Sequence, residues 1–276
     1  MNQTVQRKKI AEGKTKIVWA VLGTDEVLIE SKDEITAGDG AKHDLIKRKG
    51  FLSTETTCNC FRLLNKAGVP THFVKRVNKK TFRARRMQMI PIELVARRIA
   101  TGSFLKRHPD VQEGTVFDEL KVEFFLKDDA RHDPLMSYNE SDEFWYLWDA
   151  KIPFPSDFVD KLSSASIIAG HILDGKVAAE LEDITRRVFL IFEKAWSQQN
   201  VNLVDLKIEC GYTTDGILLV GDVIDNDSWR IWPGGDKAQM RDKQVYRDLK
   251  HTTPEALDII DKNYAWVAKA TSKFLT

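Results

Sequence analysis

The first third of the chain alternates between short apolar runs and turn residues, a pattern typical of strands. Lys16–Leu22 and Glu26–Glu30 are rich in β-branched and apolar residues, and Gly23–Asp25 separates them. Two such runs joined by a short glycine-containing turn predict a β-hairpin. Val69–Val77 and Arg86–Pro91 also predict extended chain.

Three stretches have the spacing of apolar residues that amphipathic helices show. Residues 51–67 form the first, and Gly68 predicts its end. Residues 184–196 form the second, with apolar side chains recurring every three or four positions. The third begins with Thr253 as N-cap and Pro254 at the first helical position, and runs nearly to the end of the chain.

Between these helices the pattern is less regular. Ile92–Ile99 mixes apolar and basic residues, and the chain from there to Pro134 is rich in Gly, Pro, Asp and His, which predicts a long irregular region. Taken together, the elements predict an α+β protein with two lobes. We expect a small β-rich lobe over residues 1–90 and a larger α+β lobe over residues 91–276.

Composition narrows the classes of partner. The 276 residues include 42 Lys plus Arg and 41 Asp plus Glu, a formal net charge of +1, with 42% hydrophobic residues. Duplex nucleic acid and anionic membranes both favour basic surfaces, so neither is expected as a partner. No apolar run approaches the ~20 residues of a membrane-spanning helix.

The cysteines and the N-terminal residues bear on the compartment. Cys58, Cys60 and Cys210 have no regular spacing, which predicts buried free thiols in a reducing compartment. Residues 1–10 are polar and basic and do not read as a signal peptide. We therefore expect a cytosolic protein.

Two glycine-containing loops could approach phosphate or substrate. Gly13 lies beside Lys14 and Lys16 just before a predicted strand, where backbone N–H groups and two ammonium groups can meet a phosphate. Asp39 lies between glycines and offers a carboxylate acceptor. Exposed turns are the commoner explanation of both sequences.

A second group of residues has the composition of a site for a phosphate monoester. Arg97 and Arg98 precede Gly102 and Ser103, and arginine forks pair with phosphate oxygens while hydroxyl and N–H groups complete the contact. An exposed basic helix end is the alternative. The loop at 125–134 gathers further charges that a solvated loop would also explain.

The strongest argument from residues alone concerns two predicted strands, 203–208 and 217–220. Alternation places Asp205, Lys207 and Glu209 on one face of the first strand. If residue 209 pairs with residue 220, Asp222 lies on the same face and can share a metal ion with Glu209. Magnesium prefers such oxygen ligands together with nucleotide phosphates.

A shift of one residue in this pairing would place the two carboxylates on opposite faces and remove the argument. A solvated strand face is the alternative.

These motifs occur in an order that resembles the SAICAR synthetase (phosphoribosylaminoimidazole-succinocarboxamide synthase) family, and in particular the synthetase domain of the animal bifunctional purine-biosynthesis enzyme. The resemblance runs from Ile10 to Phe274 and is most specific over 89–107, 203–209 and 222–233. It implies a two-lobed fold related to ATP-grasp proteins, with ATP and Mg2+ as cofactors and CAIR (5-amino-1-(5-phospho-D-ribosyl)imidazole-4-carboxylate) and L-aspartate as substrates. In the implied reaction ATP phosphorylates the carboxylate of CAIR, and the amine of aspartate displaces phosphate to give SAICAR.

The resemblance also implies roles for individual residues. Glu209 and Asp222 match the family's magnesium ligands. The expected ATP-binding residues are Gly13, Lys14, Lys16, Met89, Glu93, Lys127, Lys207, Glu209 and Asp222.

Matching positions in the substrate cleft complete the expected site. Lys207, Asp39 and Asp227 are the expected catalytic residues. The expected substrate-binding residues are Asp39, Arg97, Ser103, Asp133, Arg230, Lys243 and Arg247.

Other functions remain open at this point. A small-molecule kinase or another carboxylate–amine ligase would use the same phosphate-handling residues, and a non-catalytic nucleotide-binding module is a third alternative. The resemblance is also compatible with a homo-oligomer and with a carboxylase domain or partner, as the bifunctional relatives have.

Overall fold

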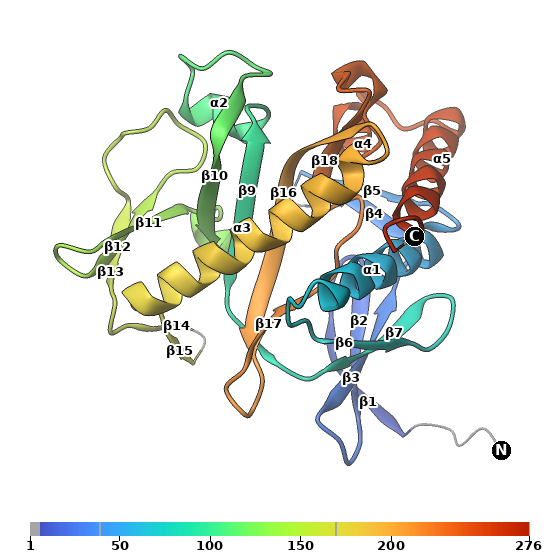
Figure 1. The fold of residues 1–276 in the computed structure, drawn as a ribbon, viewed down its shortest axis with the longest axis horizontal. Helices are drawn as coiled ribbons and strands as arrows, with labels where there is room; N and C mark the ends of the chain where they lie inside the picture. Colours follow the sequence, from blue (N-terminus) through green and yellow to red (C-terminus); the bar gives the residue numbers. More distant parts are fainter. Residues whose placement is uncertain (1–5, 39, 169, 276) are drawn as a thin grey trace.

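The first of two main antiparallel sheets is built largely from the N-terminal third of the chain. The structure, a computed structural model, describes residues 6–38, 40–168 and 170–275 (Figure 1). The predicted hairpin is confirmed, because two strands of this sheet pair through Ile17 with Glu30 and Trp19 with Leu28. In spatial order the strands are β1 (Arg7–Glu12), β2 (Lys16–Val21), β3 (Glu26–Ser31), β7 (Thr81–Arg85) and β6 (Phe73–Arg76).

The second sheet has nine strands and carries most of the candidate site. Two small hairpins complete the strands: β4 (Glu34–Ala37) with β5 (Lys42–Leu45), and β14 (Ile167–Ile168) with β15 (His171–Ile172). The path through the second sheet is β13 (Asp160–Ser163), β12 (Phe144–Trp148), β11 (Leu135–Asn139), β10 (Val116–Leu126), β9 (Ile92–Ile99), β16 (Val201–Tyr212) and β17 (Leu218–Gly221), with β8 (Gln88–Met89) and β18 (Trp229–Pro233) also paired to β16.

The expectation of an irregular chain up to Pro134 is wrong. β10 is an eleven-residue strand inside that region and pairs with β9. Its inner positions Leu120, Phe124 and Leu126 are buried in the core. The signal for this strand was its alternation of period two, which the interspersed charged residues concealed.

Helix α3 (Gly175–Ser197) crosses the face of the second sheet (Figure 1). It begins earlier than the predicted start at Ile184, because the Asp174 carboxylate caps it by accepting the Val177 N–H at 2.9 Å. Leu181, like Val188 and Phe192 further along α3, is fully buried. The helix therefore covers the sheet face opposite the candidate site.

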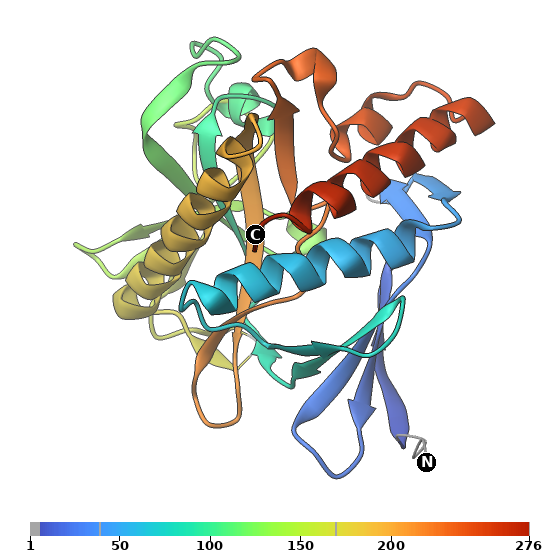
Figure 2. The ribbon, with the colours of Figure 1, turned by 45° about the vertical axis from the view of Figure 1, so that its right-hand side comes forward.

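Helices α1 (Lys49–Lys66) and α5 (Pro254–Thr271) lie side by side (Figure 2). The predicted cap of α5 is confirmed, since Thr253 Oγ1 accepts the Ala256 N–H. Gly68 follows α1 with φ of 78°, a conformation that glycine adopts without steric cost. Two short helices, α2 (Ser103–Arg107) and α4 (Gln244–Asp248), border the cleft described below.

One cluster of buried side chains connects both sheets. It includes Val27 and Phe82 from the first sheet and Leu94 and Ile208 from the second. The division into lobes at residues 90 and 91 stays a prediction. The three cysteines are buried and free, as predicted.

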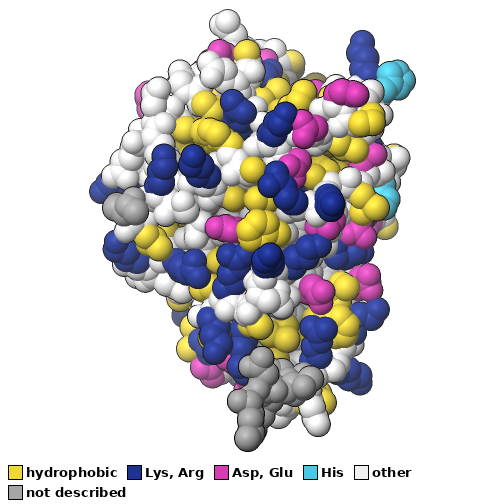
Figure 3. Space-filling model, turned by 90° about the vertical axis from the view of Figure 1, so that its right-hand side faces the viewer, with side chains coloured by type: hydrophobic (Ala, Val, Ile, Leu, Met, Phe, Trp, Pro, Cys, Tyr) yellow, Lys and Arg dark blue, Asp and Glu magenta, His cyan; other side chains and the backbone are white. Residues whose placement is uncertain are grey.

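The surface carries charges of both signs. On the face turned toward the viewer in Figure 3, Lys and Arg side chains are spread widely with Asp and Glu among them, in keeping with the net charge of +1. Among the described residues, no helix is long and apolar enough to cross a membrane.

The packing of α3 gives a test of the fold with a control in the same helix. Leu181 is 0% exposed and Leu190 is 48% exposed. We expect Leu181→Ala to lower the free energy of unfolding by about 2–5 kcal/mol, because it leaves a cavity against the sheet. Leu190→Ala should change it by less than about 0.5 kcal/mol. Unfolding in guanidinium chloride measures both, and equal effects would contradict the assigned orientation of α3.

Candidate active site

The pairing of β16 with β9 organises the site. Asp205 lies opposite Arg97, and Lys207 lies opposite Val95, on one face of the sheet. The predicted alternation along β16 is confirmed, because Lys207 Nζ donates to Glu209 Oε1 at 3.1 Å. The same ammonium donates to Glu93 Oε1 at 2.8 Å on the neighbouring strand.

A cavity of about 520 Å³ opens between the two sheets, and we call it the first cavity. Apolar side chains form one part of its wall, among them Val18, Ile29, Met89 and Ile90. Its charged lining residues include Lys16, Lys127, Glu209 and Asp222. A slot that is apolar in one part and charged in another suits a ligand with a flat ring and an anionic tail.

Glu209 is the charged centre of this wall. Its side chain is buried, and Lys127 Nζ donates to Oε2 at 2.7 Å. Burial alone would raise the pKa of Glu209, but the ammonium groups of Lys207, Lys127 and Lys16 outweigh it and lower the pKa to about 2. Burial likewise opposes the charge of Lys207, yet Glu209 and Glu93 raise the pKa of that lysine. Both groups are therefore ionised at neutral pH.

The predicted register of the β16–β17 hairpin is wrong by one residue. Glu209 pairs with Gly221, not with residue 220. In a continuing strand Asp222 would then point to the opposite face. However, β17 ends at Gly221, and Asp222 has φ of 57° in the left-handed region. This turn brings its carboxylate into the first cavity after all.

Lys16, at the start of β2, bridges the two sheets. Its Nζ donates to Asp222 Oδ1. Burial lowers the pKa of Lys16 to about 8, although Glu209 acts in the other direction. The lysine thus carries its charge at neutral pH and can face an anion in the cavity.

A second cavity of about 330 Å³ lies on the same face of the sheet, next to the first. We call it the cleft. Lys207 lines the cleft while Glu209, two residues along the strand, lines the first cavity. The residues that line the cleft are Glu93, Val95, Arg97, Ser103, Phe125, Asp133, Asp205, Lys207, Asp227, Ser228, Trp229, Arg230 and Arg247.

Arg97 is engaged by carboxylates of the protein itself. It is buried, its Nε donates to Glu123, and its Nη1 donates to Asp205 Oδ2 at 2.9 Å. Burial would raise the pKa of Glu123, but Arg97 and Arg107 outweigh it and lower that pKa. These carboxylates hold the guanidinium in the floor of the cleft, which Arg97 also lines, and its expected role as a ligand for substrate stays a prediction.

Arg230 is the guanidinium that projects further into the cleft. Its Nη1 donates to Asp205 and its Nη2 donates to Gln244 Oε1 at 3.2 Å. A Cβ at Gly102 would meet Arg230 Nη2 at 2.6 Å, and Gly102 has φ of 61°. Glycine is therefore required here for both space and conformation.

Asp227 lies at the border of the cleft between cationic and hydroxyl donors. Its Oδ2 accepts from Lys243 Nζ at 2.8 Å, and its Oδ1 accepts from Tyr264 OH at 2.5 Å. Burial opposes ionisation, but Lys49 and Lys243 lower the pKa of Asp227. The carboxylate is therefore held ionised, as an acceptor.

Most of the predicted site residues lie around these two cavities. Met89 lines the first cavity, whereas Glu93 lines the cleft. Gly13 and Lys14 form an exposed turn that lines neither, although Lys14 Nζ would be 3.6 Å from a Cβ at Gly40. Asp39 lies outside the described residues.

Sequence reasoning missed several lining residues. Val95 and Trp229 are two of them, together with Asp205, which alternation had placed on this face without a role. The signal for Val95 was the same alternation that sets Glu93 and Arg97 on one face of β9. This alternation can be recognised only when residues 92–99 are interpreted as a strand.

The donor set of the first cavity fits a magnesium ion bound together with phosphate. Glu209 and Asp222 supply carboxylate oxygens from adjoining positions of one hairpin. In the part of the chain that the structure describes, no group of three His, Cys, Asp or Glu side chains could hold a metal. Two carboxylates completed by phosphate oxygens and water are the usual magnesium arrangement.

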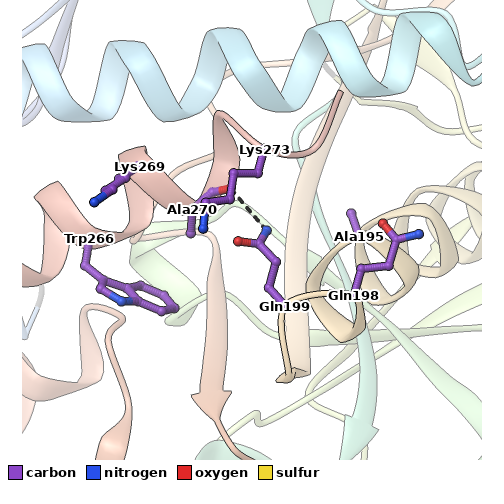
Figure 4. Close-up of a pocket in the computed structure, with 7 residues that line it drawn as sticks. All are labelled: Ala195, Gln198, Gln199, Trp266, Lys269, Ala270 and Lys273. Carbon is purple, nitrogen blue, oxygen red and sulfur yellow. Dashed lines mark hydrogen bonds between the residues drawn. The ribbon is translucent and has the colours of Figure 1, made fainter. Parts of the chain in front are cut away.

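A third cavity, of about 570 Å³, lies between the ends of α3 and α5 (Figure 4). Gln199 Nε2 donates to Ala270 O at 3.1 Å across it, and Lys269 and Lys273 border it. It shares no lining residue with the first cavity or the cleft, and no carboxylate lines it.

Comparison with known proteins gives a consistent result. A family model described as SAICAR synthetase matches residues 9–152 and 156–262. The chain is 48% identical over 270 residues to a phosphoribosylaminoimidazole-succinocarboxamide synthase of Roseiflexus sp. (strain RS-1), covering 97% of this chain and 98% of the relative. It is 46% identical to the bifunctional carboxylase/synthetase of Mus musculus, covering 95% of this chain and 57% of that protein.

Solved structures agree with the sequence comparison. The crystal structure of phosphoribosylaminoimidazole-succinocarboxamide synthase from Ehrlichia chaffeensis is similar, with a TM-score of 0.76 and 27% identity over 96% of this chain and 98% of that one. A SAICAR synthetase in complex with ADP is similar with a TM-score of 0.74 and 28% identity, over 93% and 97% of the two chains. The expected α+β fold is confirmed.

The buried arginine of the cleft floor gives a second test. Arg97→Met leaves Glu123 and Asp205 without a buried guanidinium, and we expect a loss of about 3–5 kcal/mol in the free energy of unfolding. The control is Arg187→Met on α3, whose side chain is half exposed and 3.8 Å from Asp183. That variant should change the free energy by less than about 0.5 kcal/mol. Chemical unfolding measures the free energy of unfolding of both variants. An exposed ion pair contributes at most ~1 kcal/mol, so a loss below that value for Arg97→Met would contradict the buried network.

Proposed function

The chain belongs to the SAICAR synthetase family, and we propose that its first cavity and cleft together perform the ligation for which that family is named. The reaction joins L-aspartate to the carboxylate of CAIR, at the expense of ATP, in purine biosynthesis. The single observation that supports this assignment most is the Lys207–Glu209 pair, which connects a cavity with apolar and charged walls to a cleft lined by arginines.

ATP fits the first cavity. The apolar wall around Val18 and Met89 suits adenine, and Lys16 and Lys127 can pair with phosphate oxygens. Gly13 and Lys14, on the exposed turn before β2, are proposed to cover the phosphates from the other side. The ADP complex of a similar SAICAR synthetase supports a nucleotide site.

Magnesium is the metal that the donor set suits, with Glu209 and Asp222 as the residues that would hold it. When bound, the ion neutralises phosphate charge and polarises the phosphoryl group. In the structure lysine ammonium groups pair with both carboxylates. The lysine ammonium groups therefore balance the charge of both carboxylates, and ammonium groups can also pair with phosphate oxygens.

CAIR fits the cleft. Arg230, Ser103 and Arg247 line it and can bind the phosphate of the ribonucleotide. Asp133 and Asp227, with Lys243 paired to the latter, are proposed as polar contacts to the rest of the substrate. Asp39 is proposed as a further substrate contact.

Phosphoryl transfer would occur where the two cavities adjoin. A carboxylate oxygen of CAIR attacks the γ-phosphorus of ATP, the bond to the bridging oxygen breaks, and ADP leaves with an acyl phosphate formed. The aspartate amine then attacks the acyl carbon, phosphate departs with the C–O electron pair, and the amine loses a proton. Lys207 lines the cleft beside this junction, so its ammonium can stabilise the negative charge that develops during both steps.

The setting of the enzyme is also proposed. Three buried free cysteines support a reducing compartment, the cytosol. A relative whose name is that of the synthetase alone is matched over 98% of its length. The lobe boundary at residues 90 and 91 is proposed on the predicted change from β-rich to mixed structure.

The assignment is tested by incubating purified protein with magnesium, ATP, CAIR and aspartate and following the products by mass spectrometry. We expect SAICAR and ADP in equal amounts, and no SAICAR when any one of the four is omitted. ADP without SAICAR in the complete mixture would instead indicate a kinase or hydrolysis of the acyl phosphate. No turnover by folded protein that binds ATP would indicate a non-catalytic module.

A substitution at the metal site tests the role of Asp222. We expect Asp222→Asn to lower kcat about 100-fold or more, because the magnesium ion that neutralises the phosphate charge would lose a carboxylate ligand. The control is Asp183→Asn on α3, whose carboxylate is exposed and remote from both cavities; its kcat should match that of the unmodified protein. An unchanged rate for Asp222→Asn at saturating magnesium would exclude Asp222 as a ligand.

A further inference from the structure

Helix α4 is too short to hold its own position, yet it brings two cationic side chains to the cleft. It has five residues, a length at which an isolated helix is not stable in water. Arg247 lines the cleft, and Lys243, the residue before the helix, donates to Asp227. Gln244 Oε1 accepts from both Arg230 and Arg247. Contacts with other elements must therefore hold α4 in position.

Tyr246 docks α4 into a separate hydrophobic cluster. Tyr246 is 0% exposed and packs with Ile35 from β4 and with Ile260 and Tyr264 from α5. A hydroxyl buried in this way needs a partner. It donates to Asp44 Oδ2, on β5, at 2.7 Å.

The same strand provides a cap for the end of α4. Lys42 Nζ donates to the carbonyl oxygens of Tyr246 at 2.6 Å and Leu249 at 2.8 Å, and lies 4.4 Å from the centroid of the Tyr246 ring. Carbonyls at a helix C-terminus lack partners within the helix, and a lysine side chain can satisfy them. Here the lysine comes from a hairpin more than 200 residues earlier in the chain.

Lys42 and Asp44 reach α4 together because they alternate along β5. In the β4–β5 hairpin Lys42 pairs with Ala37 and Asp44 pairs with Ile35. The residues between and after them, His43 and Leu45, are exposed on the other face. A two-stranded hairpin is itself only marginally stable, so each element fixes the other.

We propose that Lys42 and Asp44 are positioning residues, which cap and anchor α4 from the β4–β5 hairpin and thereby hold Arg247 and Lys243 at the cleft for a phosphate-bearing substrate. This inference rests on the proposed function for the identity of that substrate. Neither residue lines the cleft, so each acts through Tyr246 and the end of α4.

The kinetic test uses Lys42→Met, which removes both capping hydrogen bonds. We expect the KM for CAIR to rise about tenfold, equivalent to ~1.4 kcal/mol, with kcat and the KM for ATP changed less than about twofold. Lys42→Arg should restore the KM to within about threefold, because a guanidinium can also donate to two carbonyls. Lys47→Met, the same change at an exposed lysine on the same segment, is the matched control.

A second set of variants tests the anchor without removing the cap. Asp44→Ala and Tyr246→Phe both remove the hydrogen bond between these two side chains, and Asp44→Ala also removes the one that Thr252 Oγ1 donates to Asp44 Oδ2 at 3.0 Å. The double variant should therefore raise the KM for CAIR no more than Asp44→Ala does alone. These variants keep the inference testable if Lys42→Met does not fold. Multiplicative effects of the two changes on KM would overturn the assignment of a shared contact.

Hydrogen exchange of the 244–249 amides separates this inference from the proposed function. We expect faster exchange in Lys42→Met than in Lys47→Met, whether or not the protein makes SAICAR. Unchanged exchange overturns the capping role. Faster exchange with an unchanged KM for CAIR, or with kcat and both KM values altered alike, overturns the positioning role. Absence of product from the unmodified protein overturns the proposed function alone.

Discussion

The antiparallel pairing of β16 with β9 is the constraint on which the site depends. It sets Asp205 opposite Arg97 and Lys207 opposite Val95, so the charged side chains of two central strands share one face. On the other face Leu206 and Ile208 are buried in the core with the side chains of α3. A shift of one residue would put charges into that core and apolar groups into the cleft. The same burial that stabilises the fold therefore fixes the order of charges in the site.

Buried charges of this kind persist because each has a partner of opposite sign. Glu209 is surrounded by three ammonium groups, and Arg97 is shared between Glu123 and Asp205. Pairing offsets the large cost of removing each charge from water, although it contributes little net stability. The pairing instead keeps these side chains ionised and oriented. Side chains that are already oriented can interact with a charged substrate without first reorganising.

Much of this site could be predicted from local sequence, and the rest depended on tertiary structure. Alternation of side chains is a property of any strand, so the predicted placement of Asp205, Lys207 and Glu209 on one face is confirmed. The placement of Asp222 could not be derived, because it combines an unforeseen register with a left-handed φ. The hydrogen bond between the β4–β5 hairpin and α4 joins residues 202 positions apart and leaves no local signal.

The conformation of Asp222 shows how its carboxylate comes to line the first cavity together with that of Glu209. A residue with a side chain rarely adopts φ of 57°, and the cost is accepted mainly where function fixes the geometry. Here β17 must pair with β16 to bury Leu219 and Val220, which would turn the next carboxylate away from Glu209. The left-handed turn directly after Gly221 reverses that direction. Sheet pairing alone would direct the Asp222 carboxylate away from the first cavity, and the left-handed conformation of this one residue lets both carboxylates line it.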